Sequence, residues 1–311
     1  MTPELSSVSY GLDVAAVPSG GPQVVGAPPQ SVGDVDGSRS QTAFVLGGGG
    51  SLGAAQVGML RALLEVGVRP DFVVGTSIGS LNAAYLAGHL DPDGIESMAE
   101  LWSTVRRADV FPLSVRSLVR GVMGHRNHLV DALGLRSLIR RAEFGFGNLE
   151  DAPIPVHTVA TDLLTARPVV LSSGDTTQAL LASAAIPGVF PPVNIGGRLL
   201  VDGGVLANLP VFQAVGLGAT RLFVLPAMAE EVDMVSGGAI DVLQRSIMVA
   251  TAALTRADLV TAAASVKVHV LPVPTTTQLS IFDFGETPAL IEDAYLSSSA
   301  WLAASEYELA S

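Results

Sequence analysis

The sequence predicts an α/β fold in which helices flank a mainly parallel central sheet. Short apolar segments alternate with helical segments from residue 43 onward, which is typical of parallel strands joined by crossover helices. Hydrophobic residues make up 49% of the 311 positions, so the chain can bury a substantial core. Glycine-rich turns follow the first two predicted strands, at the carboxyl ends of the strands, where parallel sheets carry their ligand-binding sites.

The first 40 residues differ from the rest of the chain. Residues 1–40 hold six glycines and five prolines without a sustained period of two or 3.6, so we predict a mobile tail before an ordered domain at 41–311. The tail lacks the basic start and the compact apolar block of a secretory signal. Spanning a membrane needs about 20 apolar residues in a row, and the best run, 247–254, is soon followed by Arg256 and Asp258. We therefore expect a cytoplasmic protein.

The predicted elements follow in order. The apolar run 43–46 predicts a buried strand, and a helix from Ala54 ends at Gly67. A second strand at 72–74 leads into a helix at 80–90, and residues 95–150 are predicted to be a largely helical, cap-like segment. The remaining strands are predicted at 154–160, 168–172, 199–201, 222–225 and 268–270, with a short helix at 179–185.

Composition excludes several functions. The formal net charge of −12 argues against general nucleic-acid binding, which needs a basic surface. Cysteine is absent, which excludes disulfides and thiolate metal sites. His125 and His128 do not form a zinc signature, so we expect no metal, and we expect no cofactor.

A glycine loop, Gly48-Gly49-Gly50-Ser51-Leu52-Gly53, joins the first strand to the first helix. Glycines let a ligand approach the backbone closely, and free N–H groups point outward at a helix start. Such a loop suits a phosphate, a dinucleotide or an oxyanion, and it also suits an ordinary tight turn.

A second turn, Gly75-Thr76-Ser77-Ile78-Gly79, joins the second strand to the second helix. A nucleophilic serine needs a sharp turn that lifts its Oγ off the sheet, and flanking glycines relieve the crowding. The alternative is a plain glycine turn with a serine helix cap.

The two turns together favour acyl transfer. A dinucleotide fold needs an acidic residue at the end of the second strand, where this chain has Gly-Thr-Ser-Ile-Gly. No lysine follows the glycines, which excludes a phosphate-loop NTPase. An ordinary α/β-hydrolase keeps its oxyanion loop further upstream and supplies a late histidine.

A third motif, Asp202-Gly203-Gly204, follows the predicted strand 199–201. Beside Ser77, this aspartate could accept the serine proton directly, provided that desolvation raises its pKa. The alternative is a turn-forming aspartate before glycines.

In this order the three motifs make the chain resemble the patatin-like phospholipases, of the compact bacterial kind. Connecting stretches agree with the family pattern over residues 42–302, among them 160–163, 182–192, Asn208 with Pro210, and 282–284 with 290–291. The resemblance implies a three-layer patatin-like fold and a serine lipid acyl hydrolase of phospholipase A or lysophospholipase type, in lipid catabolism or remodelling.

The resemblance also implies the site residues. Ser77 and Asp202 would form a catalytic dyad without histidine, acting on a lipid ester through an acyl-enzyme. Backbone N–H groups of Gly48, Gly49 and Gly50 would form the oxyanion hole. Ser51, Gly53, Gly75, Gly79, Gly203 and Gly204 would support these motifs.

Leu52 departs from the family, which often carries arginine or lysine there. The backbone donors do not need that side chain, so we expect hydrolysis to survive, while loop rigidity and headgroup contact are put in question. Leu52 is also the feature that favours an alternative function, a non-catalytic lipid- or protein-binding module that kept the fold. His269 is the histidine that a triad would use, but it lies in an alternating strand pattern and we expect a structural role.

Residues 106–141 carry eight arginines against two aspartates, in an otherwise acidic chain. Val115, Leu118, Val119, Val122 and Met123 fall on one helical face, with Arg116 and Arg120 off it. We expect this segment to cover the site and to contact an anionic membrane peripherally; the alternative is a packed helical lid with solvated arginines.

Overall fold

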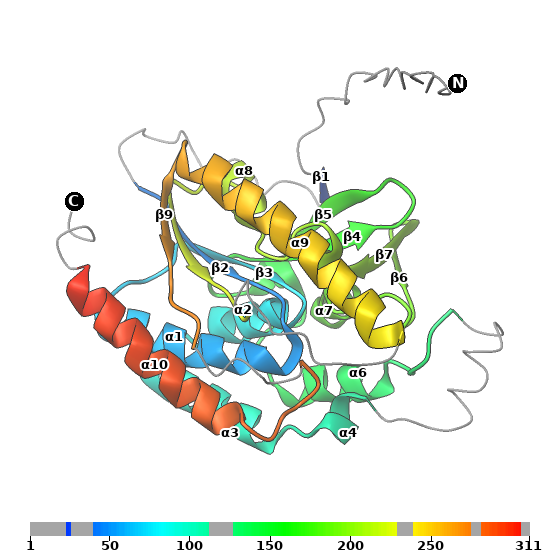
Figure 1. Cartoon of the computed structure of the whole chain (residues 1–311), viewed down its shortest axis with the longest axis horizontal. Coiled ribbons are helices and arrows are strands. Elements are labelled where there is room, and N and C mark those ends of the chain that lie inside the picture. Colours follow the sequence, from blue (N-terminus) through cyan, green and yellow to red (C-terminus); the bar gives the residue numbers. More distant parts are fainter. Residues whose placement is uncertain (1–22, 26–39, 112–126, 229–238, 275–280, 306–311) are drawn as a thin grey trace, which may run out of the picture.

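The computed structural model describes residues 23–25, 40–111, 127–228, 239–274 and 281–305. A nine-stranded mixed sheet forms the middle layer, and helices cover both of its faces (Figure 1). This confirms the predicted α/β fold with a mainly parallel sheet flanked by helices.

Five strands form the parallel part of the sheet, in the order β4-β3-β2-β8-β9. They are β2 (Thr42–Leu46), β3 (Phe72–Thr76), β4 (Val156–Asp162), β8 (Arg221–Leu225) and β9 (Lys267–Val270). Ala43 and Val45 pack into the core on one face of the sheet, and Phe44 and Leu46 pack into the core on the other. Burial on both faces explains why these strands read as continuous apolar runs.

The remaining strands extend the sheet beyond β4. Strand β5 (Arg167–Leu171) pairs antiparallel with β4, and β6 (Val193–Ile195) pairs antiparallel with β7 (Arg198–Asp202). Strand β1 (Gln23–Val25) pairs in parallel with β5. The tail expected at 1–40 therefore contains one short strand, which the sequence did not indicate because three residues are too few to show a period.

Helices divide between the two faces of the sheet (Figure 1). Helices α1 (Ala55–Glu65), α2 (Ile78–Gly88), α3 (Pro92–Thr104) and α10 (Thr287–Ala304) lie on one face, and α8 (Val211–Gly216) and α9 (Ala239–Ala263) lie on the other. Gly58 allows α1 and α10 to pack closely, because a Cβ there would clash with the carbonyl oxygen of Ile291. Among the described residues, no helix is both long and apolar enough to span a bilayer.

Shorter helices complete the chain around the site. They are α4 (Arg107–Val110), α6 (Leu133–Arg141), α7 (Thr176–Ser183) and the 3-10 turns Gly50–Ala54, Leu149–Asp151 and Gly203–Val205. The predicted boundaries differ by a few residues; α2 begins at Ile78 rather than at residue 80, directly after the Ser77 turn. Helix α9 differs from expectation, because only its apolar run 247–254 was apparent in the sequence.

Candidate active site

Ser77 occupies the sharp turn between β3 and α2. Its backbone has φ 54° and ψ −124°, a conformation that residues other than glycine rarely adopt. A Cβ on Gly75 would clash with the backbone of Gly79, and a Cβ on Gly79 would clash with the carbonyl oxygen of Leu46. The two glycines therefore permit a turn that no larger residues would allow.

Ser183 supports this strained turn. Its Oγ accepts a hydrogen bond from the N–H of Ser77 at 2.9 Å and donates one to the carbonyl oxygen of Val159 at 2.6 Å. Ser183 is fully buried at the end of α7. Ser183 lies in the family-like stretch 182–192, where a serine at the end of an apolar helix is the only sign of such a role in the sequence.

Strand β4 brings Asp202 to Ser77. On one stretch β4 pairs with β3, with Val159 opposite Thr76, and on the next it pairs with β7, with Ala160 opposite Asp202. Strand β7 therefore takes up the position beside β4 where β3 has just ended. Ser77 and Asp202 consequently meet although 125 residues separate them.

The two side chains form a short hydrogen bond. Ser77 Oγ donates to Asp202 Oδ2 at 2.6 Å, and the N–H of Gly204 donates to Asp202 Oδ1 at 2.7 Å. Burial raises the pKa of Asp202 from 3.8 to about 6, against the lowering effect of these two hydrogen bonds. An aspartate with a pKa near 6 is a stronger base than an ordinary carboxylate and is still largely ionised at neutral pH.

In the Asp202-Gly203-Gly204 turn, positions 203 and 204 require glycine for steric reasons. A Cβ on Gly203 would clash with the carbonyl oxygen of Val159, and a Cβ on Gly204 would lie 3.0 Å from Asp202 Oδ1. Glycine at both positions therefore lets the chain turn immediately after the carboxylate.

The glycine loop lies beside Ser77, with one difference from expectation. The N–H of Gly48 donates to the carbonyl oxygen of Asn208 at 3.1 Å, so it is not free to bind an oxyanion. No described residue accepts a hydrogen bond from the N–H of Gly49 or Gly50. Gly50 has φ +58° and lines the same pocket as Ser77. Of the three predicted donors, the N–H groups of Gly49 and Gly50 thus have no acceptor among the described residues, whereas that of Gly48 is bonded to the segment after Asp202.

The supporting motif residues hold this loop in place. Ser51 is fully buried and its N–H donates to the carbonyl oxygen of Ile281 at 2.9 Å. A Cβ on Gly53 would lie 2.7 Å from Ile78 Cγ2, so glycine permits the loop to pack on the start of α2. The Leu52 side chain packs against the core cluster rather than extending from the loop.

A buried polar network, which sequence analysis missed, pins the loop at both ends. Gln56 Nε2 donates to the carbonyl oxygen of Gly47 at 2.8 Å, and Asn82 Nδ2 donates to that of Gly53 at 2.9 Å. Asn82 Nδ2 also donates to Gln56 Oε1 at 2.8 Å, and Trp102 Nε1 donates to Asn82 Oδ1 at 3.1 Å. In the sequence, Gln56 and Asn82 stand out as polar residues within mainly apolar helical segments.

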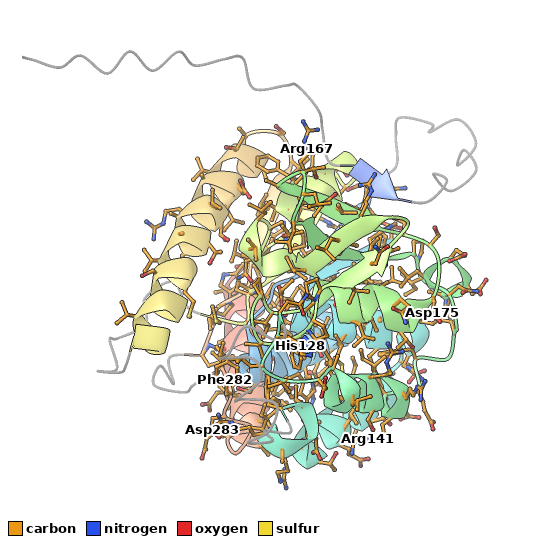
Figure 2. The ribbon with its side chains drawn as sticks, turned by 90° about the vertical axis from the view of Figure 1, so that its right-hand side faces the viewer. His128, Arg141, Arg167, Asp175, Phe282 and Asp283 are labelled. Atoms are coloured by element: carbon orange, nitrogen blue, oxygen red, sulfur yellow. The ribbon has the colours of Figure 1, made fainter. Side chains whose placement is uncertain are left out.

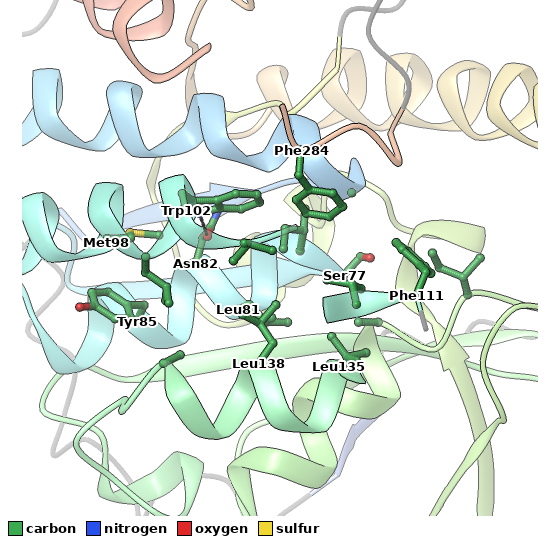
Figure 3. Close-up of a pocket in the computed structure, with 18 of the residues that line it drawn as sticks. Ser77, Leu81, Asn82, Tyr85, Met98, Trp102, Phe111, Leu135, Leu138 and Phe284 are labelled. Carbon is green, nitrogen blue, oxygen red and sulfur yellow. Dashed lines mark hydrogen bonds between the residues drawn. The ribbon is translucent and has the colours of Figure 1, made fainter. Parts of the chain in front are cut away.

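An apolar pocket opens at Ser77 (Figure 3). It has an empty volume of about 770 Å³, which includes its opening to solvent. Its walls come from α2, α3, α6 and the 184–190 segment, and Phe111 and Phe284 flank Ser77 (Figure 3). A serine, a carboxylate and free N–H groups at one end of an apolar pocket suit an ester that carries a long hydrocarbon chain.

The sheet keeps His269, the histidine that a triad would use, away from Ser77. His269 lies on β9 and stacks on Phe223, with ring centroids 4.9 Å apart. Strands β2 and β8 separate β9 from β3, so β9 lies about 14 Å from β3 at normal strand spacing. His157 is buried on β4, and burial lowers its pKa to about 4. Among the described residues, no group of three or more histidine and carboxylate side chains is placed to hold a metal.

The basic segment 106–141 is described in part. Arg106 and Arg107, and Arg140 with Arg141 at the end of α6, are exposed. Arg141 lies at the opposite end of the molecule from Arg167 (Figure 2). The apolar face from Val115 to Met123, with Arg116 and Arg120, lies outside the described residues, and so does His125.

Fold and site together define an α/β protein with a serine–aspartate pair at the carboxyl edge of its sheet. The family model for patatin-like phospholipases matches residues 44–215. The chain belongs to the patatin-like phospholipase family, which confirms the resemblance noted in the sequence.

Curated relatives match part of their own length. An uncharacterized NTE family protein of Mycobacterium tuberculosis is 34% identical over 183 residues, which cover 58% of this chain and 48% of that protein. Lysophospholipase nte1 of Aspergillus terreus is 32% identical over 180 residues, covering 58% of this chain and 11% of that protein. The matched region thus spans half or less of these relatives.

Solved structures are more distant. VipD from Legionella pneumophila aligns with a TM-score of 0.46 and 14% identity, over 85% of this chain and 67% of that one. Human GIVD cytosolic phospholipase A2 aligns with a TM-score of 0.45 and 12% identity, over 85% of this chain and 58% of that one. Similarity at this level carries no conclusion about function.

Proposed function

We propose that this protein is a serine lipid acyl hydrolase of phospholipase A or lysophospholipase type that uses a Ser77–Asp202 dyad. The observation that carries the proposal is the 2.6 Å hydrogen bond from Ser77 Oγ to a buried carboxylate at the mouth of an apolar pocket. Membership of the patatin-like family and a relative named as a lysophospholipase support the same activity.

The first half of the reaction forms an acyl-enzyme. Ser77 Oγ attacks the ester carbonyl while Asp202 Oδ2 takes its proton, and the N–H groups of Gly49 and Gly50 bind the oxyanion. The tetrahedral intermediate then breaks its bond to the alcohol oxygen, which leaves with the proton from Asp202. An acyl group remains on Ser77.

The second half releases a fatty acid. Asp202 removes a proton from water as the water oxygen attacks the acyl carbonyl, and it then returns the proton to Ser77 Oγ as the acyl–serine bond breaks. The raised pKa of Asp202 fits both roles, because the group must accept and return a proton near neutral pH.

Fluorophosphonate labelling and short-chain ester hydrolysis test this proposal. Wild type should be labelled and active, Ser77→Ala should be neither, and Asp202→Asn should lose turnover while it keeps its melting temperature or raises it. Labelling of Ser77→Ala would reject the nucleophile, and absence of any labelling of wild type would favour a non-catalytic module. If Asp202→Asn stays active while His269→Ala does not, a histidine triad replaces the dyad.

A further inference from the structure

The pocket follows helix α2 away from Ser77. Leu81 and Tyr85 follow Ser77 at four-residue steps, so these three residues lie along one face of the helix start and its next two turns. Figure 3 shows them in a row, with Ser77 at one end and Tyr85 at the other. The eight-residue separation corresponds to about 12 Å along the helix axis.

The sides of the pocket are apolar side chains from two other helices. Leu135 and Leu138 of α6 face Leu81 across the pocket, and Met98 and Trp102 of α3 form another wall. All four are buried, and the polar groups of Asn82 and Trp102 are hydrogen-bonded to each other. Among the described lining residues, no side chain between Ser77 and the far end offers a free polar group, which suits a hydrocarbon chain and disfavours a polar substituent.

Two aromatic side chains line the end of the pocket away from Ser77. Tyr85 is only 8% exposed, and its ring stacks on His89 with centroids 4.6 Å apart. Phe144 also lines the pocket and is 6% exposed. The backbone at Phe144 packs directly on the end of α2, since a Cβ on Gly88 would clash with the Phe144 carbonyl oxygen.

We propose that this pocket selects acyl chains by length, with a limit of about ten carbons set by Tyr85 and Phe144. With C–C bonds of about 1.5 Å and angles near 111°, an extended chain advances about 1.25 Å per carbon, so about 12 Å holds about ten carbons. This inference rests on the proposed function, because it takes carbon 1 of the chain to be the ester carbonyl at Ser77.

The limit has a measurable consequence. Each methylene that enters the pocket leaves water, which raises kcat/KM by up to about fourfold. Carbons beyond the tenth meet the ring of Tyr85 and stay outside or fold back, so they add nothing. Activity should therefore rise steeply with chain length and then stop rising at about ten carbons.

The experiment measures kcat/KM for p-nitrophenyl esters from four to sixteen carbons, each below its aggregation concentration. Wild type should reach its maximum near ten carbons. Leu138→Phe fills the middle of the pocket and should move the maximum to about five carbons, since Leu81 lies one turn, about 6 Å, from Ser77. Leu133→Phe is the matched control, because Leu133 is 71% exposed on the same helix and should leave the profile unchanged.

Variants of Tyr85 test whether the chain-length limit can be raised. Tyr85→Ala should extend the maximum beyond ten carbons, and Tyr85→Phe, which keeps the ring, should keep the limit. A profile that rises through sixteen carbons in wild type, or that Leu138→Phe and Tyr85→Ala leave in place, would overturn the inference while leaving the proposed hydrolysis intact.

A binding measurement keeps the test independent of turnover. Trp102 and Trp301 are the two tryptophans of the chain, so Ser77→Ala combined with Trp301→Phe leaves Trp102, in the pocket wall, as the single tryptophan, which can be excited selectively. Saturated fatty acids brominated along the chain should quench Trp102, with affinity rising up to about ten carbons and constant beyond. Absence of quenching at every length would overturn the inference even if the esterase is active.

Discussion

The side-chain amide of Gln56 holds the carbonyl oxygen of Gly47 at 2.8 Å, directly before the loop that supplies the free N–H groups of the site. The same Nε2 also donates to the carbonyl oxygen of Leu225 at 3.0 Å, at the end of β8. Gln56 thereby ties the loop to a central strand of the sheet. We infer that Gln56 is a positioning residue for the loop that carries the N–H groups of Gly49 and Gly50.

The first prediction concerns this residue. Gln56→Met keeps the volume but removes both donated hydrogen bonds, so the loop should lose its alignment. We expect kcat to fall about ten- to a hundredfold, less than for outright loss of an oxyanion donor, with KM little changed. Gln213→Met, at a buried glutamine of α8, is the control and should keep kcat. A lower melting temperature with unchanged kcat would make Gln56 merely structural.

The second prediction concerns the pH dependence of activity. Asp202 must be ionised to accept the serine proton, and burial raises its pKa to about 6. We therefore expect kcat/KM to rise about tenfold per pH unit below pH 6 and to level off above it. The profile should be retained in His269→Ala. Loss of the inflection in that variant would assign the titration to the histidine instead.

The third prediction concerns stability. The pKa of Asp202 is higher in the folded protein than its ordinary value of 3.8, so the folded state binds this proton more tightly. Stability contributed by the protonated form is therefore present at low pH and is lost as pH rises from about 4 to about 6, by up to about 3 kcal/mol. Asp202→Asn avoids this loss and should raise the melting temperature more at pH 7.5 than at pH 4.5. An equal change in melting temperature at both pH values would contradict the inference that Asp202 is charged and buried at neutral pH.

The fourth prediction concerns Ser183. Ser183→Ala leaves the N–H of Ser77 and the carbonyl oxygen of Val159 without a partner, which should cost about 1–3 kcal/mol of unfolding free energy. The strained Ser77 turn should relax, so kcat should fall about tenfold. Ser298→Ala is the matched control, because Ser298 is equally buried and its hydroxyl has no partner among the described residues. Equal losses in the two variants would mean that Ser183 does not support the turn.

The fifth prediction concerns membrane contact through the basic segment. If residues 106–141 meet an anionic surface, Arg140→Glu combined with Arg141→Glu should reduce sedimentation with phosphatidylserine-containing liposomes by severalfold. Arg167→Glu, at the opposite end of the molecule, is the control and should leave sedimentation with these liposomes unchanged (Figure 2). Binding that ignores both lipid charge and the double variant would leave the segment as a packed lid.

Much of the site followed from local spacing. The glycines around Ser77 and Asp202 are fixed by clashes with their own neighbours or with the adjoining strand, so short motifs are sufficient to predict those turns. The central strands were equally evident, because strands covered on both faces are continuous apolar runs.

The features of the site that the sequence did not predict depend on contacts between residues far apart in the chain. The N–H of Gly48 was expected to be a free donor, yet it binds Asn208, 160 residues later in the chain. The polar residues Gln56, Asn82 and Trp102 come from three helices, and nothing in a one-dimensional pattern shows that they meet. Their pairing is set by how the helices pack on the sheet.

Strands β3 and β7 both pair with β4, so the contact between Ser77 and Asp202 depends on the register of β7 against β4. Successive residues of a strand point to opposite faces, so a slip of β7 by one residue would turn Asp202 away from Ser77 while most of the core stayed buried. A refolded sample can therefore regain its secondary structure and compactness without the contact between Ser77 and Asp202. The fraction of molecules that react with a fluorophosphonate would measure correct register rather than folding in general.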